Sequence, residues 1–128
     1  MVSIAIILFL LTLTIDMVID IRKWKRENYK VNHNKKWIRG VGLVPAVVLL
    51  SWHNWWLLIP AIPMVLFLYW LLFDGLYNTL RRFPWFYTGT DDPDDAKTDN
   101  FLQRLKLWQH IAVKVGGVVL FTIIYILI

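Results

Sequence analysis

Long apolar segments alternate with polar connections along this chain. One apolar segment runs from Val2 to Ile21, and another closes the chain at Ile128. Between them, residues 40–73 contain no acidic or basic group other than His53. As a single helix this stretch would be about 50 Å long, whereas a hydrocarbon layer of about 30 Å needs only about 20 residues. The pattern therefore predicts two helices within it, with a turn between them.

The turn is predicted at residues 51–56, Ser-Trp-His-Asn-Trp-Trp, where polar residues interrupt the apolar run and tryptophan rings favour the depth of lipid headgroups. A second interpretation places the turn at Pro60 to Pro63, which would shorten the following helix. With the first placement we expect one polytopic domain, residues 1–128, with four transmembrane helices. Their expected ranges are about 2–21, 36–50, 55–80 and 108–128.

Composition supports a bilayer as the solvent of this chain. The mean hydropathy is +0.51 and 58% of the 128 residues are hydrophobic. This is too much apolar surface for the core of one small soluble domain. A β-barrel is excluded because Ser3 to Ile15 is apolar on every side instead of alternating. The absence of cysteine excludes disulfides, thiolate catalysis and cysteine-based metal sites. The expected fold class is therefore an all-α integral membrane protein.

Basic residues are concentrated in two connections. Residues 22–39 and 81–107 contain all of the 14 lysines and arginines except Lys114. Because basic loops favour the cytoplasmic side, we expect loops 22–35 and 81–107 to be cytoplasmic and both termini to lie outside a bacterial inner membrane (N-out, C-out). A short interfacial helix is expected before the last span, and the acidic run within residues 91–99 is interpreted as a solvated loop.

Polar side chains within the apolar segments are the strongest functional clues, because a charge at the centre of a membrane helix costs about 2.5 to 3.5 kcal/mol on insertion scales. They lie at helical spacing in three of the expected helices. The members are Thr12, Asp16 and Asp20; Asp74, Asn78 and Arg81; and His110 and Lys114. From their depth, an ion pair between Asp16 and Lys114 is predicted, with Asp74 as the competing partner.

These groups are expected near one membrane face, and two interpretations remain open besides a proton or ion pathway. The favoured one is a set of ion pairs and hydrogen bonds that fixes helix packing. The alternative is an acid-base or metal site, for which the catalytic candidates are Asp16, Asp20, Asp74, Asn78 and His110. Arg39 and Arg81 are candidates for contact with a headgroup or phosphate. No metal site and no cofactor are predicted, because no His-Glu-x-x-His or related spacing is present.

Small residues suggest close helix association. Ala112 and Gly116 form a small-xxx-small pair with Gly117 beside them, and Gly40 and Gly42 are candidates in the second helix. The expected partners are the bilayer, anionic lipid headgroups along the basic loop, and either further copies of the chain or a larger membrane complex. No nucleic-acid motif is present.

The sequence favours a non-catalytic structural, anchoring or oligomeric component of a membrane assembly, since it contains no reaction signature. Two other functions are kept. One is a small membrane enzyme that acts on a lipid or polyprenyl headgroup at the cytoplasmic interface, and whether the chain is catalytic stays open. The other is a small proton-coupled transporter in which Asp16 would be the acidic group.

Overall fold

The computed structural model of the protein describes residues 1–26, 37–86 and 106–128, with the side chains of 37–41 left undescribed. Within these ranges the chain is helical and contains no strand. The elements are α1 (Val2–Arg26), α2 (Trp37–Leu50), the 3-10 turn η1 (Trp55–Leu57), α3 (Leu58–Leu80) and α5 (Leu107–Leu127). The all-helical prediction is confirmed for the described chain.

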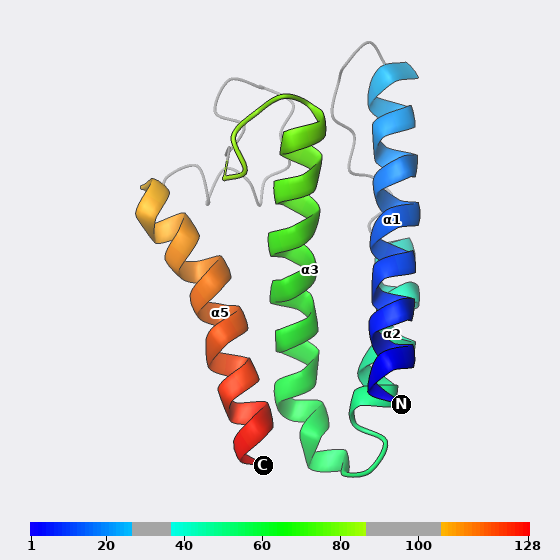
Figure 1. The fold of residues 1–128 in the computed structure, drawn as a ribbon, viewed down its shortest axis with the longest axis vertical. Helices are drawn as coiled ribbons and strands as arrows, with labels where there is room; N and C mark the ends of the chain where they lie inside the picture. Colours follow the sequence, from blue (N-terminus) through cyan, green and yellow to red (C-terminus); the bar gives the residue numbers. More distant parts are fainter. Residues whose placement is uncertain (27–36, 87–105) are drawn as a thin grey trace.

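Successive helices run in opposite directions, and α3 lies between α5 on one side and α1 with α2 on the other (Figure 1). The most extensive packing is between α3 and α5 and between α1 and α2, whereas α3 contacts α1 and α2 less. Both termini lie at one end of the molecule (Figure 1). The C-terminal ends of α1 and α3 and the start of α5 lie at the other end.

Three helical segments are long and apolar enough to cross a membrane: Val2–Arg26, Trp55–Leu80 and Leu107–Leu127. The fourth predicted span corresponds to α2, which is a helix of 14 residues. At 1.5 Å per residue it is about 21 Å long, less than the roughly 30 Å of a hydrocarbon layer. The interfacial helix predicted before the last span falls outside the described residues.

Helix α1 is longer than predicted, because it continues past Ile21 through a basic last turn that contains Lys23, Lys25 and Arg26. Cations at a helix C-terminus are stabilised by the partial negative charge there. Long basic side chains can also extend their charges away from an apolar helix end. The helix can therefore continue beyond the last residue of the apolar segment.

The turn between α2 and α3 lies where the first sequence interpretation placed it. Leu50 ends α2, and the Asn54 side chain accepts a hydrogen bond from the Trp56 backbone N–H at 3.1 Å to cap η1. Trp52, Trp55 and Trp56 are 60%, 75% and 71% exposed, as rings at headgroup depth should be. The rival turn at Pro60 to Pro63 is wrong, because α3 runs through both prolines. Pro60 lies in its first turn, where no donor is needed.

The buried core lies where α1, α2 and one face of α3 meet. Its α3 part is a ladder of rings at four-residue spacing, in which Tyr69, Phe73 and Tyr77 stack with centroids 5.6 and 5.7 Å apart. The other members are Ala5, Phe9 and Leu13 of α1, Leu43 and Ala46 of α2, and Val65 of α3. The outward faces of α1 and α5 are apolar and exposed, which is the surface that lipid covers in a membrane helix.

Candidate functional site

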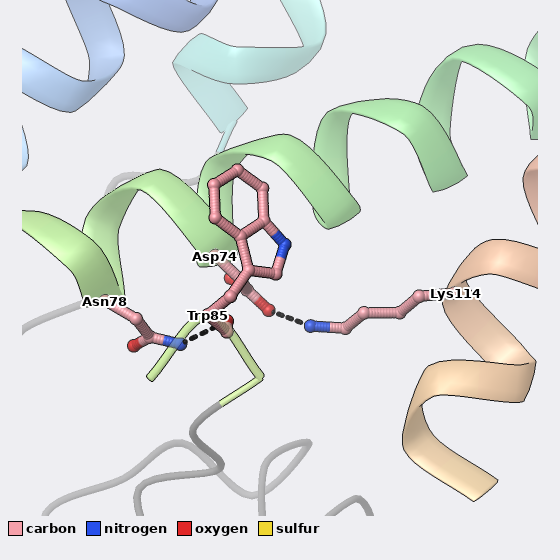
Figure 2. Close-up of polar contacts among 4 residues, drawn as sticks. All are labelled: Asp74, Asn78, Trp85 and Lys114. Carbon is pink, nitrogen blue, oxygen red and sulfur yellow. Dashed lines mark hydrogen bonds and ion pairs between the residues drawn. The ribbon is translucent and has the colours of Figure 1, made fainter. Parts of the chain in front are cut away.

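A short ion pair joins α3 and α5, the two helices that pack most extensively. From α5 the Lys114 Nζ atom lies 2.5 Å from Asp74 Oδ2 of α3, and the two side chains point toward each other (Figure 2). Only 4% of the Lys114 side chain is exposed, against 37% for Asp74. The Lys114 ammonium also lies over the Trp70 ring, 4.6 Å from its centroid. A carboxylate and an aromatic face together therefore hold this buried cation.

His110 extends the same contact one turn toward the start of α5. Its ring is 3% exposed and lies 6.2 Å, centroid to centroid, from the Trp70 ring. His110 and Lys114 are the buried residues of α5. These two polar side chains of α5 thus face α3, whereas most of its apolar side chains face outward, the reverse of a helix in a soluble protein.

Asp16 occupies a different contact, on the opposite side of α3. Its side chain is 9% exposed, and Asp16 Oδ2 accepts a hydrogen bond from the Tyr69 hydroxyl of α3. The Phe9 ring packs edge-on against the Tyr69 ring, with centroids 6.1 Å apart. This hydrogen bond links α1 to α3 within the apolar core.

The structure thus gives Lys114 the competing partner, Asp74, in place of the favoured Asp16. Asp16 and Lys114 lie on helices that α3 separates (Figure 1). Depth along each helix could be estimated from sequence, but depth alone does not decide which helices are neighbours. The single polar cluster expected from sequence is therefore divided between two faces of α3.

The end of α3 folds the following residues back onto the helix. The Arg82 N–H donates to the Thr79 carbonyl and the Phe83 N–H to the Asn78 carbonyl, at 3.0 and 2.9 Å. This pattern is a Schellman motif, and Arg82 takes the left-handed position with φ 66°, where glycine is usual. Pro84 follows, and it cannot continue a helix.

The returning chain places the Trp85 ring on α3 beside Asp74 (Figure 2). Asn78 Nδ2 donates to the Trp85 carbonyl at 3.1 Å. A Cβ atom at Gly75 would lie 1.8 Å from the Trp85 ring, so only glycine leaves room for it. Asn78, a catalytic candidate from sequence, is therefore engaged in anchoring this turn.

Arg81, at the same helix end, is surrounded by aromatic rings. Its guanidinium carbon lies 5.4, 5.2 and 5.1 Å from the ring centroids of Trp24, Tyr77 and Phe83. Arg81 Nε is buried without a hydrogen-bond partner. The ring of Trp24 comes from α1 and that of Tyr77 from α3, so this contact joins the ends of two helices.

The other predicted residues have simpler outcomes. Asp20 lies on α1 one turn beyond Asp16, at the same end of the molecule as Arg81. The side chain of Arg39, His33 and the acidic run 91–99 lie outside the described residues. Within the described part of the chain, no group of three or more His, Asp or Glu residues could hold a metal ion.

Three aromatic contributors were missed from sequence: Tyr69, Trp70 and Trp85. Tyr69 had a usable signal, because Tyr69, Phe73, Tyr77 and Arg81 follow one another at four-residue spacing and so share a helix face. Trp70 and Trp85 had none, since nothing in an apolar run marks which ring meets a charge on another helix.

Fold and contacts together define a helical protein with three helices able to cross a membrane, joined by polar side chains on both faces of the central helix. Comparisons with family models, with curated proteins and with solved structures each found no match.

Proposed function

We propose that this chain is an integral membrane protein whose role is non-catalytic assembly, as a structural subunit or anchor that associates with copies of itself or with another membrane protein. The observation that carries the proposal is how its buried polar groups are used. Asp16 accepts from Tyr69, and Lys114 pairs with Asp74. The Tyr125 hydroxyl donates to the Leu50 carbonyl at 2.7 Å. Each contact crosses between helices, which in an apolar solvent favours association.

Helix α5 supplies the face best suited to a partner. A Cβ atom at Gly116 would meet nothing within 4 Å, and Ala112, one turn earlier, is also exposed. Small residues on an outward face let a second helix approach closely. Large apolar side chains flank them, including Val113 and Leu120, which are 41% and 54% exposed.

The proposed orientation has both termini outside a bacterial inner membrane, with basic connections in the cytoplasm next to anionic lipid. Support comes from the basic residues that the structure describes. Arg22, Lys23, Lys25 and Arg26 end α1, Arg81 and Arg82 end α3, and Lys106 precedes α5, all at one end of the molecule. The opposite end carries the exposed tryptophans of the turn after α2.

A photo-reactive amino acid at position 116, activated in native membranes, tests the assembly role. We expect a covalent protein adduct: one of twice the 15.2 kDa chain mass indicates self-association, and another mass identifies a partner. The matched control is the same probe at Leu11, an exposed apolar position of α1 at 52%. Lipid adducts alone at position 116, with a monomeric mass in nanodiscs, would contradict the proposal.

The two alternative functions have less support. An enzyme would need its acid-base groups together, but Asp16 meets α3 on the side that faces α1, whereas Asp74 pairs with Lys114 on the side that faces α5. Stoichiometric divalent metal in the purified protein, with loss of turnover in Asp74→Asn, would favour the enzyme. For transport, proton-coupled flux into liposomes that disappears in Asp16→Asn would favour that function over assembly.

A further inference from the structure

We infer that Arg81 is the centre of a specific binding site for the phosphate of an anionic phospholipid. The inference rests on the proposed membrane location and deepens it, because it replaces general attraction to a basic surface with one defined contact. The starting observation is that Arg81 is partly buried among rings instead of lying extended at the surface.

The rings determine which part of Arg81 can bind a ligand. Trp24, Tyr77 and Phe83 lie 5.1 to 5.4 Å from the guanidinium carbon, at distances where a guanidinium stacks on aromatic faces. With rings beside the guanidinium and Nε buried, the two Nη groups are the route to an acceptor from outside. The rings also restrict side-chain motion, so less conformational entropy is lost when the fork binds.

The hydrogen-bonding capacity of the fork is not satisfied. Nε is buried without a partner, and among the described residues no carboxylate forms an ion pair with Arg81. A buried donor without an acceptor is unfavourable, because it has lost its hydrogen bonds to water. Because Nε is covered by the protein, an acceptor with two adjacent oxygens would bind the fork through its two Nη groups.

The position of Arg81 and the charges around it indicate an anionic ligand that comes from the lipid bilayer. Arg81 ends α3, one of the three segments able to cross a membrane, so it lies at the depth where lipid phosphates are expected. Lys23, Lys25 and Arg26 in the last turn of α1, together with Arg82, add positive charge at the same end. A phosphodiester with no compensating cation of its own, such as that of phosphatidylglycerol, fits this site best.

A purely structural role for Arg81 makes a different prediction. A cation at the C-terminus of α3 balances the partial negative charge of the helix end, and lysine does this as well as arginine. A bidentate phosphate contact requires the planar fork, which lysine lacks. Exchange of arginine for lysine keeps the net charge. Loss of the ring contacts would lower the thermal midpoint, whereas loss of the phosphate contact would weaken lipid binding, so the two measurements separate the roles.

The experiment titrates delipidated protein in detergent with phosphatidylglycerol and measures the first bound lipid by native mass spectrometry. We expect Arg81→Lys to weaken this binding about tenfold, the loss of one charge-assisted bidentate contact. Arg82→Lys, at the exposed neighbouring position, is expected to leave it unchanged. Phosphatidylcholine is expected to bind at least tenfold more weakly to the unaltered chain, and inorganic phosphate should not displace phosphatidylglycerol.

Equal binding by Arg81→Lys and Arg82→Lys would overturn the site. Displacement of phosphatidylglycerol by inorganic phosphate would show that the site binds a free anion and not specifically the phosphate of a lipid. Helical content and thermal midpoint in detergent are measured in parallel, so that a misfolded variant is recognised, and Arg81→Gln then serves as the second test. If Arg81→Lys and Arg82→Lys bind phosphatidylglycerol equally while the protein still requires detergent and still cross-links at position 116, the lipid site is refuted and the assembly role stands.

Discussion

Lys114 shows how a single charged side chain can decide the packing of an apolar helix. With 4% of its side chain exposed, its ammonium cannot be hydrated as in water, and an unpaired buried charge is strongly unfavourable. Asp74 at 2.5 Å and the Trp70 ring at 4.6 Å provide what water does not. Because Asp74 remains 37% exposed, water can solvate it in part. Lys114 therefore depends on Asp74 more than Asp74 depends on Lys114.

That inequality gives the first prediction. Asp74→Asn leaves a buried ammonium without a counter-charge, so it should destabilise the protein by about 1 to 3 kcal/mol. Lys114→Met keeps most of the length of the buried chain and leaves only a partly exposed carboxylate unpaired, so its cost should be smaller. The free energy of unfolding is measured by denaturant titration in mixed micelles for each single variant and for the double variant, which completes a double-mutant cycle. An Asp74→Asn cost equal to or below that of Lys114→Met would refute the unequal dependence of the two partners, and a coupling energy of zero in the cycle would show that the pair does not hold α5 on α3.

Sequence reasoning at this scale identified which residues need partners but not all of the partners. Asp16, Asp74, His110 and Lys114 stand out because charged or imidazole groups are rare in apolar helices. The partners that the structure adds, Tyr69 and Trp70, are ordinary residues of such helices. Their role comes from position in space, which a linear pattern does not contain.

Helix α3 is the central element because both of its faces are used for packing. One face carries the ring ladder of Tyr69, Phe73 and Tyr77 toward α1 and α2. The other carries Phe67, whose ring stacks on Phe121 of α5 with centroids 5.9 Å apart. A 3.6-residue helical period over an almost wholly apolar sequence predicts the helix, but it cannot assign a neighbour to each face.

The two adjacent glycines of α5 make opposite predictions because they lie about 100° apart around the helix, and only Gly117 faces α3. A Cβ atom at Gly117 would lie 2.5 Å from Phe67 Cδ1, whereas at Gly116 it would meet nothing within 4 Å. Gly117→Ala should force α5 away from α3 and destabilise the protein by about 1 kcal/mol or more. Gly116→Ala should be neutral or stabilising by up to about 1 kcal/mol within the monomer, since alanine is the better helix former.

Thermal midpoints of both alanine variants in detergent check this prediction. The two substitutions add the same atoms to the same helix, so each serves as the control for the other. If Gly117→Ala unfolded no earlier than Gly116→Ala, the close approach of α5 to Phe67 would be refuted.

Element lengths were only partly predictable. Basic residues suggested an end for α1 at Ile21, yet the helix continues to Arg26, since lysine and arginine are good helix formers. The turn at residues 51–54 was predictable because serine, histidine and asparagine interrupt an apolar run at a place where a single helix would exceed the bilayer thickness.

For the whole molecule, the antiparallel order of the helices determines which ends meet. Both termini and the turn after α2 lie at one end, and the ends of α1 and α3 lie at the other (Figure 1). In a bilayer this arrangement would place both basic connections on one side, in agreement with the orientation that we propose from the distribution of lysine and arginine. The short α2 would then require local thinning of the bilayer or entry of polar residues into its edge.

The orientation is testable without background labelling because the chain contains no cysteine. In intact cells, a membrane-impermeant maleimide should label His53→Cys from outside. It should label Lys25→Cys and Lys106→Cys only after permeabilisation. Labelling of Lys25→Cys and Lys106→Cys from opposite sides would reject both the four-span topology and its proposed orientation.

What the sequence determined by itself was the helical class, the helices long and apolar enough to cross a membrane, the main turn and the polar positions that need partners. Each follows from local quantities: the apolar length against a bilayer, the distribution of charge along the chain, and the cost of a polar group in hydrocarbon. Only the tertiary structure decided that Lys114 meets Asp74 while Asp16 meets Tyr69, and that Arg81 is enclosed by rings from two helices. Those pairings depend on which helix lies beside which. An apolar helix surface can pack against many neighbours, and only the packed side chains select one of them.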